Sequence, residues 1–400
     1  MSRRLRLDAA VVGGGVVGSA CALALAQQGL DVALLESREP SRWSPGQRDL
    51  RVYAFAPDNA ALLDGLGVWP SVRDARVQPY RHMRVWDAAG GSELAFDADA
   101  FARMELGWIV EHGLLVDRLW SALPRAGVRV QCPACVVGID PHEDGARLRL
   151  GDDGTLDARL VIAADGAESS VRRLLGIGID AQDYAQKGVV AYVRSELPHA
   201  QTAWQRFLPT GPLALLPFAD ADDAQPRGHC SSIVWTLPLA DADRVVAMDA
   251  GEFDRELTAA SGGRLGALTL DSPRAAFPLR RQLADEYLRG RVLLLGDAAH
   301  VVHPLAGQGV NLGLRDVAAL QALVRDAQAR RGDYAAPSRL QRWARTRRSE
   351  NALSARAFSA INHAFSNDSV AMTLLRGPLL GMAGRIPPLS HALWRHAAGG

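Results

Sequence analysis

The sequence predicts an α/β protein, and three observations support that prediction. The chain opens with a strand, a glycine-rich turn, a helix and a second strand, which is the pattern of a parallel βαβ unit. Two later apolar strands end beside an acid and a glycine, at residues 165–166 and 296–297. Alternating runs such as HMRVWD and SSIVWTL are typical of an antiparallel sheet. At 400 residues, the chain is long enough for two or three domains.

The opening unit has the spacing of a dinucleotide-binding site. A strand over Leu7–Val12 leads into the turn GGGVVG, and a helix of small residues runs to Gln28. A second strand over Asp31–Leu35 ends at Glu36. This order predicts a Rossmann-like βαβ unit with a ligand at the turn.

Three glycines and one acid of this unit have distinct physical roles. Gly13 permits the tight turn, Gly15 lets the backbone approach a pyrophosphate, and Gly18 lets the helix pack on the strand. The phosphates would lie at the helix N-terminus, where free N–H groups and the helix dipole favour anions. Glu36 can accept hydrogen bonds from a ribose diol and would repel a 2′-phosphate, which favours FAD or NAD over NADP at this position.

The same N-terminal stretch has a second interpretation. The basic start MSRRLRL followed by the uncharged run Ala9–Ala26 resembles a signal peptide and approaches the length of a membrane span. Asp8 interrupts the approach, the glycines weaken a membrane helix, and the βαβ pattern explains the whole segment. We therefore expect a mature, soluble segment.

Composition and charge constrain the partners and the compartment. A formal net charge of +1 gives no global attraction to nucleic acid. Four cysteines in so long a chain do not form a disulfide framework, so we expect a reducing, cytoplasmic compartment. In VRVQCPACVVGI, Pro133 interrupts a strand, so we interpret the CxxC pair as structural rather than redox-active.

The order of patterns along the chain predicts a discontinuous domain organisation. A strand or loop enters a helix over residues 49–69, a short strand enters a helix over 107–123, and alternating runs occupy 80–96 and 188–277. We expect a Rossmann-like cofactor domain, an inserted and mainly antiparallel substrate domain, and a C-terminal helical region. The predicted ranges are 1–75, 100–180 and 278–335 for the first, 76–99 and 181–277 for the second, and 336–400 for the third.

Two motifs repeat the design of a buried strand that ends at an acid. In RLVIAADGAESSVRR the strand ends at Asp165-Gly166, and in RVLLLGDAAH it ends at Gly296-Asp297. Ligands of open α/β sheets bind at the carboxyl ends of the strands. We therefore expect both acids to face one ligand.

A further glycine-rich turn follows the second acid. Gly307, Gln308 and Gly309 precede an amphipathic helix whose N-terminus is expected near Val310. A second helix N-terminus would thereby be directed at the ligand of Asp297.

His300 and His303 form an HxxH pair inside GDAAHVVHP. A metal would need further ligands that nothing nearby clearly supplies, so no metal site is predicted. We interpret the two histidines as parts of the loop between the acid and the glycines, with a direct catalytic role as the alternative.

The tail after Pro337 is helical in pattern and rich in arginine. We interpret it as a solvated basic face on a packed helix, with contact to a lipid or anionic surface as the alternative. Its apolar stretch VAMTLLRGPLLGMAG is expected to pack as a helix. The clustered arginines are Arg339, Arg342, Arg345, Arg347 and Arg348.

Taken in order, GGGVVG with Glu36, AADGAESSVRR and GDAAHVVHPLAGQGVNLGLRDV resemble the single-component FAD-dependent aromatic hydroxylases, the family of p-hydroxybenzoate hydroxylase. The stretches DLRVYAFAPDNAALLDGLGVW, YRHMRVWDAAG, GWIVEHGLL and FPLRRQLADEYLRGRVLLLGDAAH resemble the ubiquinone-biosynthesis ring hydroxylases within it. The first stretch departs from the pattern, because related enzymes often have small or hydroxylated residues in place of Phe55, Pro57, Asp58 and Asn59. The similarity covers nearly the whole chain and weakens in the tail.

The resemblance implies roles for individual residues. The three glycines of the first turn would bind the FAD pyrophosphate, Glu36 the adenosine ribose, and Arg51 the phosphate region of the flavin. Asp165 and Gly166 would support both FAD and the docking of NAD(P)H, and Asp297 would hold the ribityl chain.

The segment 304–311 would lie along the pyrimidine edge of the isoalloxazine. The backbone amides of Gly309, Val310 and Asn311 are the candidate donors there. The other members of the implied FAD site in this segment are Pro304, Gly307 and Gln308.

The resemblance also implies the chemistry. In such enzymes FAD is reduced by NAD(P)H and adds O₂ to form a flavin hydroperoxide, whose distal OH is transferred to an electron-rich ring carbon. The implied substrate is a polyprenylated phenol or benzoquinol of ubiquinone biosynthesis, and the implied partners include other proteins of that pathway and the inner face of the membrane. The base that would deprotonate a phenol is not identified, with His82, His112 and His229 as candidates only because they are histidines.

Other functions remain open from the sequence. The chain could hydroxylate a different aromatic compound, or act as a non-catalytic flavin-binding subunit of a biosynthetic complex. An NAD-dependent dehydrogenase could use the same N-terminal unit, but it leaves the GDAAH and GQGVN motifs unexplained.

Overall fold

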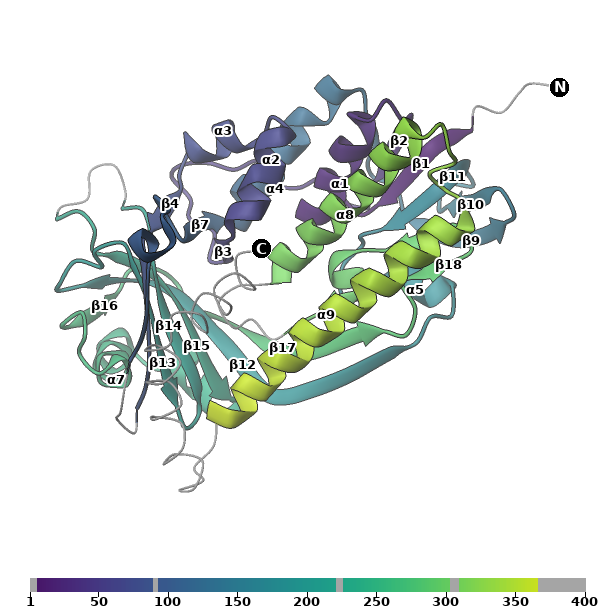
Figure 1. Cartoon of the computed structure of the whole chain (residues 1–400). Coiled ribbons are helices and arrows are strands. Elements are labelled where there is room, and N and C mark those ends of the chain that lie inside the picture. Colours follow the sequence, from purple (N-terminus) through teal and green to yellow (C-terminus); the bar gives the residue numbers. More distant parts are fainter. Residues whose placement is uncertain (1–5, 89–92, 221–225, 303–308, 366–400) are drawn as a thin grey trace.

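A computed structural model describes residues 6–88, 93–220, 226–302 and 309–365 of the chain. It confirms the predicted α/β fold. Figure 1 shows a mainly parallel sheet with its helices at one end of the molecule and a mainly antiparallel sheet at the other.

The mainly parallel sheet is built around the N-terminal strand. Its strands are β1 (Leu7–Val12), β2 (Val32–Leu35), β8 (Arg129–Gln131), β9 (Val136–His142), β10 (Gly145–Leu150), β11 (Thr155–Ala163), β18 (Leu288–Arg289) and β19 (Val292–Leu294). The order is β18-β19-β11-β1-β2-β8, with β10 and β9 joined beside β11. β19, β11, β1, β2 and β8 are parallel, so the ends of β1, β11 and β19, which precede the sequence motifs, share one edge.

Small residues allow the helices to pack closely on this sheet. Helix α1 (Val16–Ala26) has the sequence VVGSACALALA and is buried over almost its whole length. It contacts α8 (Gly309–Ala329) on one side and α4 (His112–Ala122) on the other. Short η2 (Pro124–Ala126) follows α4, and α5 (Ser170–Leu174) follows β11.

A three-stranded sheet lies next to α4 and α8. It has the order β3-β7-β4, with β3 (Val52–Phe55), β7 (Gly107–Glu111) and β4 (Gln78–Tyr80). The helices α2 (Pro57–Gly65) and α3 (Trp69–Arg73) follow β3. The guanidinium of Arg48, just before β3, pairs with Asp271 at 2.9 Å and lies over the Tyr192 ring.

The antiparallel sheet has the order β20-β17-β12-β15-β14-β13-β5-β6, and β16 pairs with β12. Its strands are β5 (His82–Asp87), β6 (Leu94–Asp97), β12 (Ile179–Ser195), β13 (Thr202–Leu208), β14 (Gly211–Pro217), β15 (Cys230–Pro238), β16 (Leu268–Leu270), β17 (Ala275–Ala284) and β20 (His300–Val301). Short η1 (Ala98–Phe101) follows β6. One face packs on α6 (Leu239–Ala247) and α7 (Ala250–Ser261) through a separate apolar core.

Two strands join the antiparallel sheet to the GDAAH segment. In Figure 1, β12 and β17 run from the antiparallel sheet toward the parallel one. β17 pairs with β20 immediately after η3 (Gly296–Ala298), with Leu283 opposite His300. The cofactor motif and the second sheet are therefore connected by direct strand pairing.

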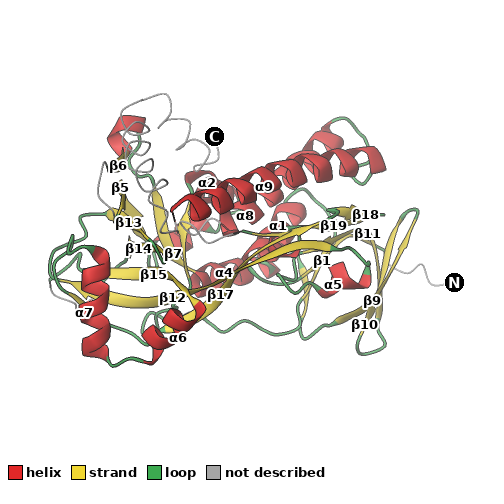
Figure 2. Cartoon of the chain, turned by 90° about the horizontal axis from the view of Figure 1, so that it is seen from below, coloured by secondary structure: helices red, strands yellow, loops and turns green. Residues whose placement is uncertain are grey.

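Helix α9 (Pro337–Phe365) packs along α8, as Figure 2 shows from below. Within it, Arg347 is buried and ion-paired to Asp316, so our placement of this arginine on the solvated face was wrong. The apolar stretch at 370–384 lies outside the described residues. Among the described helices, none combines the length and apolarity needed to cross a membrane.

We expect Gly313→Ala to destabilise the protein, although alanine usually favours a helix over glycine by about 0.5–1 kcal/mol. A Cβ at this position of α8 would stand 2.6 Å from a methyl carbon of Val17 and 3.2 Å from the Cα of Gly296. Such overpacking costs about 1–3 kcal/mol. Gly65→Ala at the end of α2 has open space around it and serves as the control. Urea unfolding should show a lower free energy of unfolding for Gly313→Ala and no decrease for the control. A higher free energy of unfolding for Gly313→Ala would contradict this packing.

Candidate cofactor site

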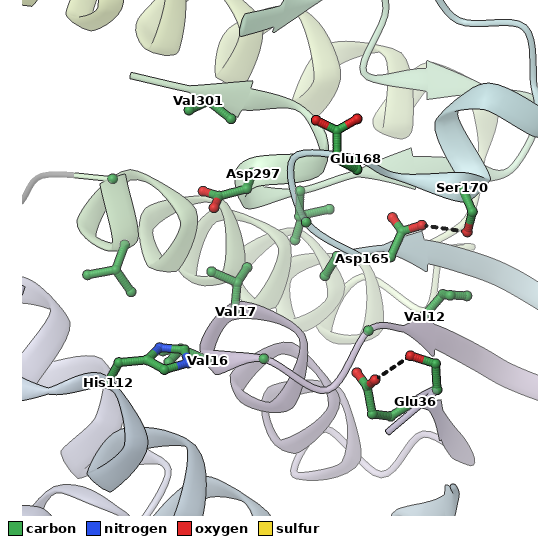
Figure 3. A pocket seen from close by; sticks show the side chains of 18 of the residues that line it. Val12, Val16, Val17, Glu36, His112, Asp165, Glu168, Ser170, Asp297 and Val301 are labelled. Atoms are coloured by element: carbon green, nitrogen blue, oxygen red, sulfur yellow. Dashed lines mark hydrogen bonds between the residues drawn. The ribbon is translucent and has the colours of Figure 1, made fainter. Parts of the chain in front are cut away.

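A cavity of about 720 Å³ lies at the carboxyl edge of the parallel strands. Its walls come from the turn after β1, the ends of β2 and β11, the loop after β8, strand β3, the start of α4, strand β17 and the start of α8. Figure 3 shows Glu36, Asp165 and Asp297 projecting into it from three different elements. The fold thus brings the separate sequence motifs to one place.

The glycine turn has the tight geometry that the sequence predicts. Gly13 has φ +104°, and a Cβ there would stand 2.4 Å from the carbonyl oxygen of Ala164. A Cβ on Gly18 would stand 1.9 Å from the carbonyl oxygen of Gly13, so this glycine packs α1 onto the turn and does not line the cavity.

The N-terminus of α1 is open toward the cavity. Gly15 is its N-cap residue and supplies no side-chain cap, and a Cβ added there would have no neighbour within 4 Å. The first turn of α1 contains no acid. Its first N–H groups and the positive end of its dipole are therefore left for an anionic ligand.

Glu36 is positioned at the end of β2 by the backbone of the turn. Its carboxylate accepts hydrogen bonds from the N–H of Gly14 at 2.6 Å and from the N–H of Arg38 at 3.0 Å. The side chain is partly exposed and faces the cavity. A carboxylate held in this way is oriented to accept further hydrogen bonds from a diol.

Asp165 closes the turn that follows β11. Its carboxylate accepts hydrogen bonds from the hydroxyls of Ser169 at 2.5 Å and Ser170 at 3.0 Å, and from the N–H of Val171 at 3.1 Å. Gly166 has φ +84°, which favours glycine. Both residues line the cavity, and the aspartate also holds the loop in shape.

Asp297 lies in the middle of the cavity wall, on η3. Gly309 and Val310, the first residues of α8, line the cavity as well. A second helix N-terminus therefore faces the same space as α1.

Arg51, Tyr53 and His112 form the wall contributed by β3 and α4. The Arg51 guanidinium lies 5.5 Å from the centre of the Tyr53 ring, and the Tyr53 hydroxyl is 2.9 Å from Nδ1 of His112. Burial, and then the charge of Arg51, lower the pKa of His112 to about 4. The imidazole is therefore neutral at pH 7, and only one of its nitrogens then carries a proton.

Several predicted residues take other places. The Asn311 side chain is buried, accepting from the N–H of Ala56 at 3.1 Å and donating to the carbonyl of Ala54 at 2.8 Å. His300 is buried against Asp316 and does not line the cavity. His303, Pro304, Gly307 and Gln308 lie outside the described residues.

The other histidine candidates are remote from this cavity. His82 pairs with Asp97, and His229 contacts the carbonyl of Ser195, and neither lines the cavity. Among the described residues, no group of three or more histidine, cysteine or acidic side chains is placed to hold a metal ion.

Sequence reasoning missed the wall that β17 supplies. Phe277 and Leu279 face the cavity, and Arg280 forms an ion pair with Glu168 across its edge. Alternating runs indicated a sheet here, but the long-range pairing of β17 with β20 decides which residues reach the cofactor motif. Cys135 of the CPAC segment also lines the cavity, which the motif alone did not indicate.

The residues fit FAD. Two helix N-termini can face the negatively charged parts of such a molecule, and the glycine turn leaves room for a pyrophosphate beside α1. Glu36 stands where a ribose diol would follow, and the cavity is of the size that cofactor sites have.

Comparison with known proteins agrees with this geometry. Residues 6–351 match the family described as "FAD binding domain". The 3-demethoxyubiquinol 3-hydroxylase of Escherichia coli is 35% identical over 396 residues, which cover 98% of each chain. The ubiquinone hydroxylase UbiL of Rhodospirillum rubrum is 36% identical over 98% of this chain and 89% of its own. The human mitochondrial ubiquinone biosynthesis monooxygenase COQ6 is 31% identical over 98% of this chain and 92% of its own.

Solved structures support the fold. The p-nitrophenol 4-monooxygenase PnpA of Pseudomonas putida has a TM-score of 0.76 at 20% identity, covering 98% of both chains. A variant of Klebsiella pneumoniae HpxO, solved in complex with FAD, has a TM-score of 0.73 at 19% identity and covers 99% of this chain and 100% of its own.

Fold and cavity together define a flavoprotein with a discontinuous Rossmann-like cofactor domain. The chain belongs to the FAD binding domain family. Its resemblance to the ubiquinone-biosynthesis ring hydroxylases, first seen in the motifs, is confirmed over nearly the whole chain.

The lowered pKa of His112 predicts a pH-dependent stability. An unfolded histidine titrates near 6.5, so between that pH and about 4 the unfolded state binds a proton that the folded state does not. The contribution of the neutral His112 to the free energy of unfolding is therefore fully present at pH 7, and it decreases as the pH falls. Between pH 7 and pH 5, the free energy of unfolding should decrease in both proteins. We expect the decrease in His112→Gln to be about 1–2 kcal/mol smaller than in the wild type, measured by urea unfolding. Equal losses in the two proteins would contradict a neutral, partly buried His112.

Proposed function

We propose that the protein is an FAD-dependent monooxygenase that hydroxylates the aromatic ring of a polyprenylated phenol or benzoquinol of ubiquinone biosynthesis, using NAD(P)H and O₂. One observation carries the proposal: an apolar wall from the antiparallel sheet, with Phe277 and Leu279, borders the same cavity as the cofactor residues. A flavin and an apolar ring can therefore meet there. The full-length similarity to ubiquinone hydroxylases supports this substrate class.

The chain's residues bind and orient the cofactor. The N-terminus of α1 would face the pyrophosphate and Glu36 the adenosine ribose, while Asp297 would bind the ribityl chain. The amides at the start of α8 would donate to the pyrimidine edge of the ring, where the helix dipole favours negative charge. When bound, FAD supplies the redox and oxygen chemistry.

The antiparallel sheet would hold the substrate. Phe277 is 40% exposed, whereas Leu279 beside it is buried. An exposed aromatic ring at the edge of a cofactor cavity favours the binding of an apolar or aromatic ligand, which would cover it and exclude water. We therefore retain residues 76–99 and 181–277 as the proposed substrate domain, and add β17 as its contact with the cofactor.

Arg280 and Glu168 mark the proposed docking place of the reductant. Their ion pair links β17 to the turn that carries Asp165 and Gly166. Glu168 is exposed, and its pKa is lowered through its hydrogen bond with Arg280 and the charge of that arginine. A phosphate of NAD(P)H would compete with Glu168 for the arginine.

The FAD-containing protein should consume NADPH slowly alone and faster with a short-chain prenylated phenol, and mass spectrometry should find one added oxygen in the product.

Asp297→Ala should lower FAD retention about tenfold or more, because a hydrogen-bond acceptor for the cofactor is lost.

Asp326→Ala, at an exposed position of α8, is the control for loss of a carboxylate. NADPH consumption that never yields an oxygenated product with any prenylated phenol would contradict the proposed reaction. A colourless protein that does not take up FAD would contradict both functions that require it, the hydroxylase and the non-catalytic flavin-binding subunit.

We also propose that the outer face of α9 contacts an anionic membrane surface, because the proposed substrate is a lipid. Arg342, Arg345 and Arg356 are exposed and have no ion-pair partner among the described residues. At 3.6 residues per turn they fall on the same side of the helix as Leu353, which is 63% exposed. Basic residues around an exposed apolar side chain are typical of helices that lie on a membrane surface.

Arg342→Glu combined with Arg345→Glu should abolish most binding to vesicles that contain phosphatidylglycerol, measured by co-sedimentation at low salt. Arg125→Glu with Arg255→Glu gives the same change of charge at exposed positions on other elements. Equal binding by both variants, or no binding by the wild type, would refute the contact.

A further inference from the structure

A buried carboxylate lies behind the wall of the cofactor cavity. Asp316 is on α8, and its side chain is fully buried. One oxygen accepts from Nε of Arg347 at 2.7 Å and from the side-chain amide of Asn351 at 3.1 Å. The other is 2.7 Å from Nε2 of His300 and accepts from the N–H of Gly296 at 3.1 Å.

These partners keep the carboxylate charged in a buried place. Burial by itself raises the pKa of a carboxyl group, but the charges and hydrogen bonds of His300 and Arg347 outweigh that effect. The pKa of Asp316 is therefore held below its ordinary value. Such a group is strongly directional, because each of its bonds is charge-assisted and no water competes for them.

Two of the four bonds hold the segment that carries Asp297. The N–H of Gly296 precedes this acid by one residue, and His300 follows it by three. The next two residues, Val301 and Val302, line the cavity. One carboxylate thus anchors the cavity wall on both sides of its central acid.

The remaining degrees of freedom of this segment are restricted by packing. Gly296 has φ +56°, and a Cβ there would stand 3.2 Å from the side chain of Val17. The His300 ring stacks on Tyr287, with 6.1 Å between ring centres. The segment between the two anchors cannot shift without breaking a bond to Asp316.

The other two bonds come from α9, whose described residues do not line the cavity. Arg347 is buried, donates to Asp316 and to the side chain of Asn351, and also pairs with Glu350. Helix α9 is thereby linked to the cofactor wall through a single acid on α8.

We propose that Asp316 is a positioning residue for the FAD site, and that through it α9 determines the position of Asp297 although no described residue of α9 reaches the cavity. This role deepens the proposed function, because it assigns a residue that acts on the cofactor site. Of the proposed function, it rests only on the binding of FAD.

Asp316→Asn tests the proposal, because an amide cannot accept from all four donors at once. The affinity of the apoprotein for FAD, followed by the change in flavin fluorescence, should fall about tenfold or more. Arg347→Lys removes only part of the hydrogen bonding from α9 to Asp316. It should therefore lower the affinity for FAD by a smaller factor. Both variants should also shift the visible absorption maxima of bound FAD, which a general loss of stability would leave unchanged.

Asp58→Asn is the matched control. Asp58 pairs with Arg315, the neighbour of Asp316 on α8, at 2.7 Å, and none of the described residues 296–302 is its hydrogen-bond or ion-pair partner. It should leave the affinity for FAD within about twofold of the wild type. If Asp316→Asn does not fold, the comparison of Arg347→Lys with this control decides.

Unchanged FAD affinity in folded variants of Asp316 or Arg347 would overturn the proposal, as would an equal loss in Asp58→Asn. These measurements need no substrate, so they are independent of whether the protein hydroxylates a prenylated phenol.

Discussion

The site depends on the close packing of α1 against α8 over the end of the parallel sheet. Val17 of α1 fits against two glycines, Gly296 and Gly313, where a Cβ would stand 3.2 Å and 2.6 Å from its methyl carbons. This contact brings two helix N-termini to one cavity. Two positive dipole ends in the same space would repel each other without a ligand, so their arrangement favours an anionic molecule between them.

The acids around that space have different tasks. Glu36, Asp165 and Asp297 line the cavity, but the Asp165 carboxylate also accepts hydrogen bonds from its own turn, and Asp316 is buried behind the wall. The two structural acids hold the loops on which the binding residues lie. A flavin reacts at a rate that depends on its orientation, so such support matters as much as direct contact.

Much of this arrangement could be predicted from local sequence. The βαβ turn, the strands that end at Asp165 and Asp297, and the helix that begins near Val310 each have a signal within a few residues. Parallel pairing then places their ends at one edge without further information. The resemblance to a known family added the identity of the cofactor, which the residues alone left open between FAD and NAD.

What could not be predicted depends on long-range pairing. His300 stands out in the sequence as a catalytic or metal residue, but its partner is sixteen positions away on α8 and is itself held by Arg347 of α9. Phe277 belongs to a run that indicates only a strand, and the pairing of β17 with β20 brings it to the cavity. Such contacts join elements whose relative positions no local pattern specifies.

We infer that one cavity binds FAD between the N-termini of α1 and α8. A crystal structure of the protein with FAD would test this placement. We expect a pyrophosphate within hydrogen-bonding distance of the first N–H groups of α1, a ribose diol on the Glu36 carboxylate, and the isoalloxazine between the start of α8 and Phe277. FAD bound elsewhere, or bound here with its adenine at Phe277 and its isoalloxazine at Glu36, would contradict this placement.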